Sequence, residues 1–174
     1  MTRSTSEQFI HLTDERELPR ADLLSLQAAA FECPIPELLP ANQRWLARRN
    51  DDLIGHLAIQ RRWFAVNANY CEGWMLGGVC TRPAHQHQGV GTRMLERALA
   101  DLRQQKLPFA ELNCGASLCA FYAHVGFVKI AAQALYWRDG RMETDADPVL
   151  ACALHQGYAL SQLRCEAFPF LLDF

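Results

Sequence analysis

Residues 79–91 read V-C-T-R-P-A-H-Q-H-Q-G-V-G, and the interpretation of the whole chain depends on this stretch. Its first residues have the character of a strand end, Pro83 stops the strand, and two glycines precede a helical pattern. The spacing of Gly89 and Gly91 is not the dinucleotide fingerprint G-x-G-x-x-G, and the Lys-Ser or Lys-Thr pair of a P-loop does not follow. The stretch is therefore either a tight strand–helix turn or an anion-binding turn of another type, because glycines let a ligand approach a helix N-terminus closely.

Composition favours one compact domain with a small-molecule ligand. The chain has 174 residues, half of them hydrophobic, and a formal net charge of −2. Near-neutral charge argues against nucleic acid or an anionic membrane as the main partner. The N-terminal sequence M-T-R-S-T-S-E-Q lacks the apolar core of a signal peptide, and no apolar run approaches the roughly 20 residues that span a bilayer. We therefore expect a cytoplasmic protein without a nucleic-acid or membrane partner.

The cysteines indicate free thiols. There are seven, an odd number, and no C-x-x-C pair occurs among them. Cys114, Cys119 and His124 are close in sequence, but their spacing matches no zinc pattern, so we expect no metal.

The order of predicted elements indicates a mixed α/β layer fold and not a Rossmann sheet. Strands are expected at residues 8–12, 44–49, 53–60, 74–81, 109–114, 128–137 and 149–154, and helices at residues 19–32, 91–105 and 117–125. The helix at 91–105 is the clearest, because apolar residues recur in it at helical spacing. Gly126 suits the left-handed position that ends the third helix.

Two motifs in this order resemble the GCN5-related N-acetyltransferases (GNAT family). The first is a strand followed by Pro83, Gln86, Gly89 and Gly91 at the opening of a helix, and the second is F-Y-A-H-V-G-F at residues 121–127. The resemblance covers residues 53–137 well and the rest loosely. It implies an α/β (α+β) GNAT fold, in which helices flank a mixed, mostly antiparallel central sheet. We expect one domain over residues 1–154 and a C-terminal extension over residues 155–174 that packs back near the substrate site.

The resemblance implies acetyl-CoA as the cosubstrate. Backbone N–H groups of residues 86–92 would hold the pyrophosphate, and the strand before them would pair with the pantetheine and the acetyl group. An N–H there would also polarise the thioester carbonyl. The residues assigned to acetyl-CoA are Val79, Cys80, Thr81, Gln86, His87, Gln88, Gly89, Val90, Gly91 and Thr92.

Tyr122 matches the family tyrosine that protonates the departing CoA thiolate. Taken alone it would be interpreted as a core aromatic. The attacking amine must be neutral and needs a base. At the strand position where the enzymes of similar sequence carry a glutamate, this chain has Gly77. The base is therefore left unassigned between two candidates, Glu111 on the neighbouring predicted strand and Glu72; each could also be an ordinary surface carboxylate.

A finer resemblance concerns the acyl acceptor. The sequence I-Q-R-R at residues 59–62 and the C-terminal Asp173-Phe174 are similar to aminoglycoside 2′-N-acetyltransferases, with nodulation N-acyltransferases in the same neighbourhood. This implies direct attack, in a ternary complex, by a primary amine of a small molecule such as an amino sugar, with Asp173 and Phe174 in the substrate site. Transfer of a longer acyl chain and a CoA-binding sensor without turnover are the alternatives, and homodimerisation is left open.

Overall fold

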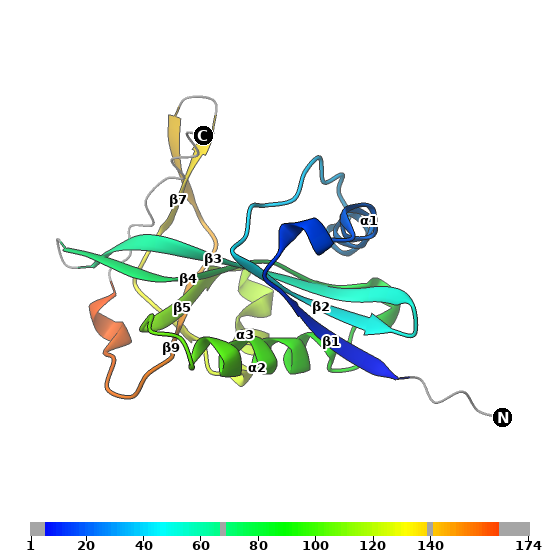
Figure 1. The fold of residues 1–174 in the computed structure, drawn as a ribbon. Coiled ribbons are helices and arrows are strands. Elements are labelled where there is room, and N and C mark those ends of the chain that lie inside the picture. The colour runs from blue at the N-terminus through cyan, green and yellow to red at the C-terminus, as the bar shows by residue number, and fades with distance from the viewer. Residues whose placement is uncertain (1–5, 67–68, 139–140, 164–174) are drawn as a thin grey trace. The chain divides into compact units, whose positions relative to one another are not determined.

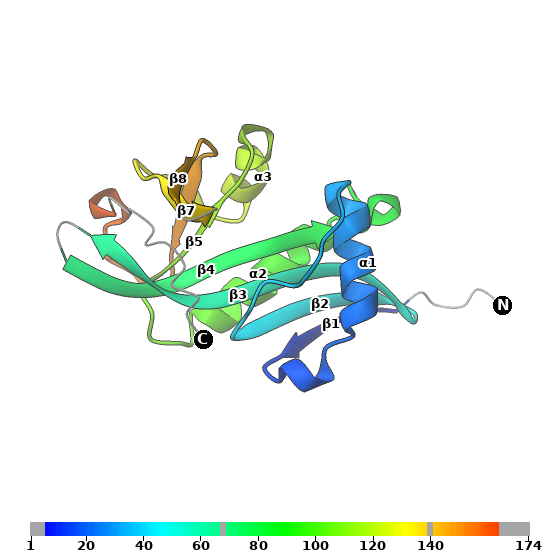
Figure 2. The ribbon, with the colours of Figure 1, turned by 90° about the horizontal axis from the view of Figure 1, so that it is seen from above.

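The computed structural model describes residues 6–66, 69–138 and 141–163 (Figures 1 and 2). The α-helices are α1 (Arg20–Phe31), α2 (Val90–Leu102) and α3 (Cys119–His124). The strands are β1 (Glu7–Leu12), β2 (Gln43–Arg49), β3 (Asp52–Val66), β4 (Asn69–Thr81), β5 (Phe109–Asn113), β6 (Val128–Lys129), β7 (Ala134–Arg138), β8 (Arg141–Asp145) and β9 (Val149–Ala153).

The described strands form one seven-stranded sheet in the order β1-β2-β3-β4-β5-β9-β6 and a separate β7–β8 hairpin. The pair β4–β5 is parallel, whereas β1–β2, β2–β3, β5–β9 and β6–β9 are antiparallel. The expectation of a mixed, mostly antiparallel sheet flanked by helices is therefore confirmed.

The chain divides into two compact units, of which the first contains residues up to Gln60 and Leu76–Asp101. In this unit α1 and α2 cover opposite faces of β1–β3 (Figures 1 and 2). Leu23 of α1 packs in an apolar cluster with Leu46 of β2. On the other face, a Cβ at Gly55 of β3 would lie 3.4 Å from Val90 of α2, so the absence of a side chain at this glycine lets the helix approach the sheet.

The second unit contains Arg61–Met75 and the chain from Leu102 onward. Phe109 of β5 is fully buried, and its ring contacts Phe64 edge-on at 5.0 Å and stacks on Tyr158 at 5.6 Å. A Cβ at Gly73 of β4 would lie only 2.6 Å from the Phe109 ring, so only glycine fits beside this core aromatic.

Two sequence expectations about elements are wrong. The single strand expected at 128–137 is in fact two separate strands. Strand β6 ends at Lys129, the next residue, Ile130, is buried in the core, and β7 begins at Ala134. The partner of β7 is β8, which was not predicted because four of the five residues Arg141–Asp145 are charged or polar. Two helices are also shorter than expected. Helix α2 begins at Val90 but already ends at Leu102, and α3 begins only at Cys119, after a 3-10 turn over Ala116–Leu118.

Several expectations fall where the structure gives little or no information. Residues 164–174 lie outside the described part, so Asp173, Phe174 and the packing of the extension remain predictions, as does the domain division. Within the described ranges, no helix is long and apolar enough to cross a membrane. The same ranges contain no group of three or more His, Cys, Asp or Glu that could hold a metal ion.

Candidate active site

The turn that follows β4 is tied to both of its neighbouring strands. After Thr81 the chain makes a 3-10 turn over Pro83–His85 and enters α2 at Val90. The Arg82 N–H donates to the Ile54 carbonyl of β3 at 2.8 Å, and the Gln86 side-chain amide donates to the Thr81 carbonyl at 3.1 Å. These bonds fix how the helix follows the strand.

The same turn exposes backbone donors. Gly89 has a φ of 73°, a left-handed conformation that favours glycine. The first N–H of α2 that bonds within the turn is that of Arg93, which donates to the Gly89 carbonyl at 3.0 Å. Val90, Gly91 and Thr92 precede it, and the N–H groups at a helix start have no carbonyl one turn earlier. The geometry suits an anion, because unpaired N–H groups and the helix dipole converge there.

Charged side chains that sequence reasoning missed surround this turn. Arg93 donates to the Gln88 carbonyl at 3.1 Å, and Arg49 of β2 donates to the Gln88 side-chain oxygen at 2.7 Å. Glu7 of β1 pairs with both arginines, at 2.7 and 3.1 Å. Burial acts to raise the pKa of Glu7, but hydrogen bonds from Arg93 and Arg49 outweigh it and lower this pKa. Two guanidinium groups with one carboxylate leave an excess of positive charge beside the turn.

The strand part of the site contains an inert thiol. Val79 and Thr81 are half-buried, whereas Cys80 is buried, and burial raises the pKa of its thiol to about 12. Burial therefore disfavours the thiolate, which is the nucleophilic form of a cysteine.

The carboxyl group of Glu111 lies in the interior of the second unit. Glu111 occupies β5 opposite Ala151 of β9 and is only 4% exposed. Burial raises the pKa of this carboxyl to about 8. The alternative base, Glu72, is engaged by Arg61 in an ion pair. The Glu111 carboxyl therefore becomes ionised, and able to accept a proton, as the pH rises toward 8.

Tyr122 lies in α3 and is buried. Its ring packs edge-on against Phe121, at a centroid distance of 4.9 Å, and against Phe127, at 5.9 Å. Gly126 has a φ of 99°, which confirms the left-handed helix end expected from the sequence. The Tyr122 carbonyl accepts the Phe127 N–H at 3.1 Å, so the motif at residues 121–127 forms a packed corner.

A family model, the acetyltransferase (GNAT) family, matches residues 7–127. The chain belongs to the GNAT family. Among solved structures, this GNAT protein is similar to ElaA of Escherichia coli, with 20% identity, a TM-score of 0.61 and coverage of 84% of this chain and 99% of the other. It is also similar to an acyl-CoA N-acyltransferase from Pseudomonas aeruginosa, with 22% identity, a TM-score of 0.61 and coverage of 85% and 100%.

A third similar structure is a GNAT family acetyltransferase from Brucella melitensis in complex with acetyl-CoA, with 18% identity, a TM-score of 0.55 and coverage of 70% and 83%. At these identities the similarity shows the fold alone. Comparison with curated proteins by sequence gives no match.

The place of the expected glutamate in this GNAT protein is a half-buried glycine. A Cβ at Gly77 would lie 3.5 Å from Leu39, an ordinary contact distance, so the backbone has room for a side chain there. The residues assigned to acetyl-CoA, 79–81 and 86–92, lie together in the first unit, whereas Glu111 and Tyr122 lie in the second.

Proposed function

We propose that this GNAT protein transfers the acetyl group of acetyl-CoA to a primary amine of a small molecule. The observation that supports it most is the turn between β4 and α2, where a left-handed Gly89 precedes the first N–H groups of α2. The φ of 73° at Gly89 is a conformation that residues with a side chain rarely adopt, so this turn favours glycine. The acetyl-CoA complex of the Brucella melitensis protein supports the choice of cosubstrate.

In this proposal residues 86–92 hold the pyrophosphate through backbone N–H groups, and residues 79–81 hold the pantetheine and the acetyl group. Arg49 and Arg93 add positive potential without being the main donors, because Glu7 already pairs with them. An N–H of β4 that points at the thioester oxygen would stabilise the negative charge that develops there during attack.

Proton transfer is assigned to two side chains of the second unit. The amine nitrogen attacks the thioester carbonyl carbon, and the proton that it loses passes to the Glu111 carboxylate. The carbon–sulfur bond then breaks, and the Tyr122 hydroxyl protonates the CoA sulfur. A thiolate with a pKa of about 8.5 leaves without an acid, so Tyr122 accelerates this step without being essential to it.

For the acceptor we propose an aminoglycoside-like amino sugar, on the basis of the sequence resemblance at residues 59–62 and at the C-terminus. Asp173 would attract a cationic amine, with Phe174 beside it in the substrate site. Removal of these two residues should then change the selectivity among amines more than the affinity for acetyl-CoA, measured as kcat/KM over an amine panel. Equal selectivity would remove Asp173 and Phe174 from the substrate site.

The cosubstrate assignment is tested by calorimetric titration of acetyl-CoA into three proteins. Gly89→Glu places a bulky anion in the turn and should weaken binding by about 10-fold or more. Ala100→Glu adds the same charge at an exposed position near the other end of α2 and should bind like the wild type. Equal affinity in Gly89→Glu would refute the phosphate assignment, and no binding by the wild type would refute the proposal as a whole.

A further inference from the structure

Strand β4 contains a bulge at Gly78. A Cβ at Gly77 would contact Leu39, in the segment that joins α1 to β2, and Cys80 packs in the apolar cluster with Leu23 of α1. Both positions therefore face the α1 side of the sheet, although residues three apart in a regular strand face opposite sides. Gly78, with a φ of 57°, accounts for this, because a left-handed glycine inserts one extra residue into a strand. The bulge thus decides where the backbone groups of residues 79–81 point.

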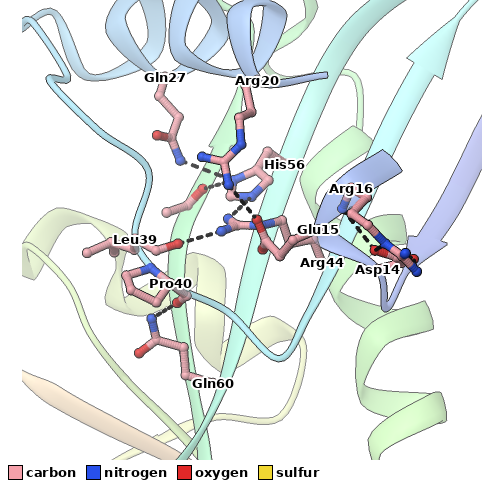
Figure 3. Close-up of polar contacts among 11 residues, drawn as sticks. Asp14, Glu15, Arg16, Arg20, Gln27, Leu39, Pro40, Arg44, His56 and Gln60 are labelled. Atoms are coloured by element: carbon pink, nitrogen blue, oxygen red, sulfur yellow. Dashed lines mark hydrogen bonds and ion pairs between the residues drawn. The ribbon is translucent and has the colours of Figure 1, made fainter. Parts of the chain in front are cut away.

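A buried imidazole holds the carbonyl of this bulge. Nδ1 of His56, in β3, lies 2.8 Å from the Gly78 oxygen, and His56 is fully buried. On the other side of the ring, Nη1 of Arg44 lies 3.1 Å from Nε2. Nε2 of Gln27, in α1, lies 3.2 Å from Nδ1 (Figure 3).

Arg44 is itself buried and held by groups that leave it little freedom. Its Nε donates to the Glu15 carboxylate at 2.7 Å, and its Nη2 donates to the Leu39 carbonyl. Figure 3 shows the guanidinium between Glu15 and His56. The side-chain amide of Gln60, in β3, donates to the Pro40 carbonyl. Arg44 and Gln60 thus hydrogen-bond to two consecutive carbonyls of the segment before β2.

These contacts determine the protonation of His56. A guanidinium has only donors, so Nε2 accepts from Arg44 and carries no proton. Nδ1 then carries the ring proton and donates it to the Gly78 carbonyl at 2.8 Å. A protonated Nδ1 cannot also accept, so Nε2 of Gln27, 3.2 Å away, contacts the ring without a hydrogen bond in this tautomer. Burial foremost, together with the nearby charge of Arg44, lowers the pKa of His56 to about 4, so the ring is neutral at physiological pH.

We propose that His56 is a positioning residue for acetyl transfer: held by Arg44 as the Nδ1–H tautomer, it fixes the Gly78 bulge and thereby aims the N–H groups of residues 79–81 at the thioester. This inference rests on the proposed function. The proposal concerns a residue of another strand, His56 of β3, that contacts neither reacting group. The geometry of β4 depends on the tautomer of its ring.

Two conservative substitutions separate the two contacts of the ring. In His56→Asn the side-chain amide takes the place of Nδ1 and still donates to Gly78, but Arg44 loses its acceptor. In His56→Gln the amide reaches the place of Nε2 and accepts from Arg44, but the Gly78 carbonyl loses its donor. We expect kcat to fall about 10-fold in His56→Gln and about 2-fold or less in His56→Asn, with the KM for acetyl-CoA unchanged in both.

A matched control is Leu23→Ala, which destabilises the same apolar cluster without touching the bulge. Thermal unfolding identifies the temperature at which each variant is folded, and kcat is compared below it. A purely structural role would be shown by equal kcat in all folded variants, and an equal or larger loss in His56→Asn than in His56→Gln would also overturn the proposal.

A second readout does not need turnover. Long-range proton–nitrogen NMR spectra of the wild type should show His56 protonated at Nδ1, and amide hydrogen exchange at Val79 and Cys80 should accelerate in His56→Gln more than in His56→Asn. Observation of the Nε2–H tautomer, or equal amide exchange rates in the two variants, would refute the proposal that the His56 hydrogen bond fixes the bulge. Normal NMR results with no amine-dependent turnover by the wild type would refute the proposed function instead.

Discussion

Replacement of Glu111 by Gln tests whether β5 contains a carboxyl group that stays protonated near neutral pH. Burial raises the pKa of Glu111 from 4.5 to about 8. The folded protein therefore binds this proton more tightly than the unfolded chain, and folding loses stability as the pH rises from about 4.5 to about 8. Ionisation of Glu111 in the unfolded chain lowers the free energy of unfolding by about 3 kcal/mol at pH 7 and by less than about 1 kcal/mol at pH 5. Gln has nearly the same shape as Glu and does not ionise, so the Glu111→Gln variant does not lose this stability as the pH rises.

The assay is urea unfolding of the wild type and Glu111→Gln from pH 5 to pH 8.5. The free energy of unfolding of the variant should exceed that of the wild type by about 3 kcal/mol at pH 7, and the gap should narrow toward pH 5. Taking the difference between the two proteins cancels every other titrating group. Glu96→Gln, at an exposed position of α2, controls for the loss of one negative charge. A gap that does not change with pH, or a variant less stable than the wild type at pH 7, would refute the raised pKa.

The same substitution tests the role of Glu111 as the base. We expect kcat of Glu111→Gln to fall by about 100-fold or more, and the rise of the wild-type kcat toward pH 8 to disappear, because the proton acceptor is lost. An unchanged pH profile in the variant would assign the base to another group.

Three further expectations concern single contacts. Tyr122→Phe should lower kcat about 10-fold and leave the KM for acetyl-CoA unchanged, measured by steady-state kinetics; an unchanged kcat would leave Tyr122 a packing residue. Gly73→Ala should lower the free energy of unfolding by about 1–3 kcal/mol in urea, because its Cβ would lie 2.6 Å from the Phe109 ring; wild-type stability would contradict this contact. Since the pKa of His56 falls from 6.5 to about 4 on folding, the wild type should lose about 3 kcal/mol of stability between pH 7 and pH 4 that His56→Asn does not lose; equal losses would refute the neutral ring.

The sequence predicted the parts of the site whose signals are local. The strand end, Pro83, the glycines and the apolar spacing of the following helix lie within some 25 residues, and each acts through the backbone conformation of its own position. The structure confirms β4, the turn and α2 in that order. Gly126 was predictable for the same reason, since a glycine after a short helix has a conformational role that needs no distant partner.

Features that depend on distant residues were not predictable. Arg44, His56 and Gly78 come from three strands and form one polar network only after the sheet has assembled. In the sequence, His56 is one polar residue in an apolar strand, with nothing to indicate its partner. Glu111 is likewise buried only after β5 has taken its place in the sheet beside β9, so its pKa could not be derived from the sequence.

The most direct test of the account is release of the CoA thiol from acetyl-CoA by the wild-type protein, corrected for hydrolysis, over a panel of primary amines that includes amino sugars, with mass-spectrometric detection of the acetylated amine. We predict thiol release that depends on the amine and is matched one-for-one by acetylated product. Binding of acetyl-CoA without acceleration of thiol release by any amine of the panel would contradict it and favour a CoA-binding sensor.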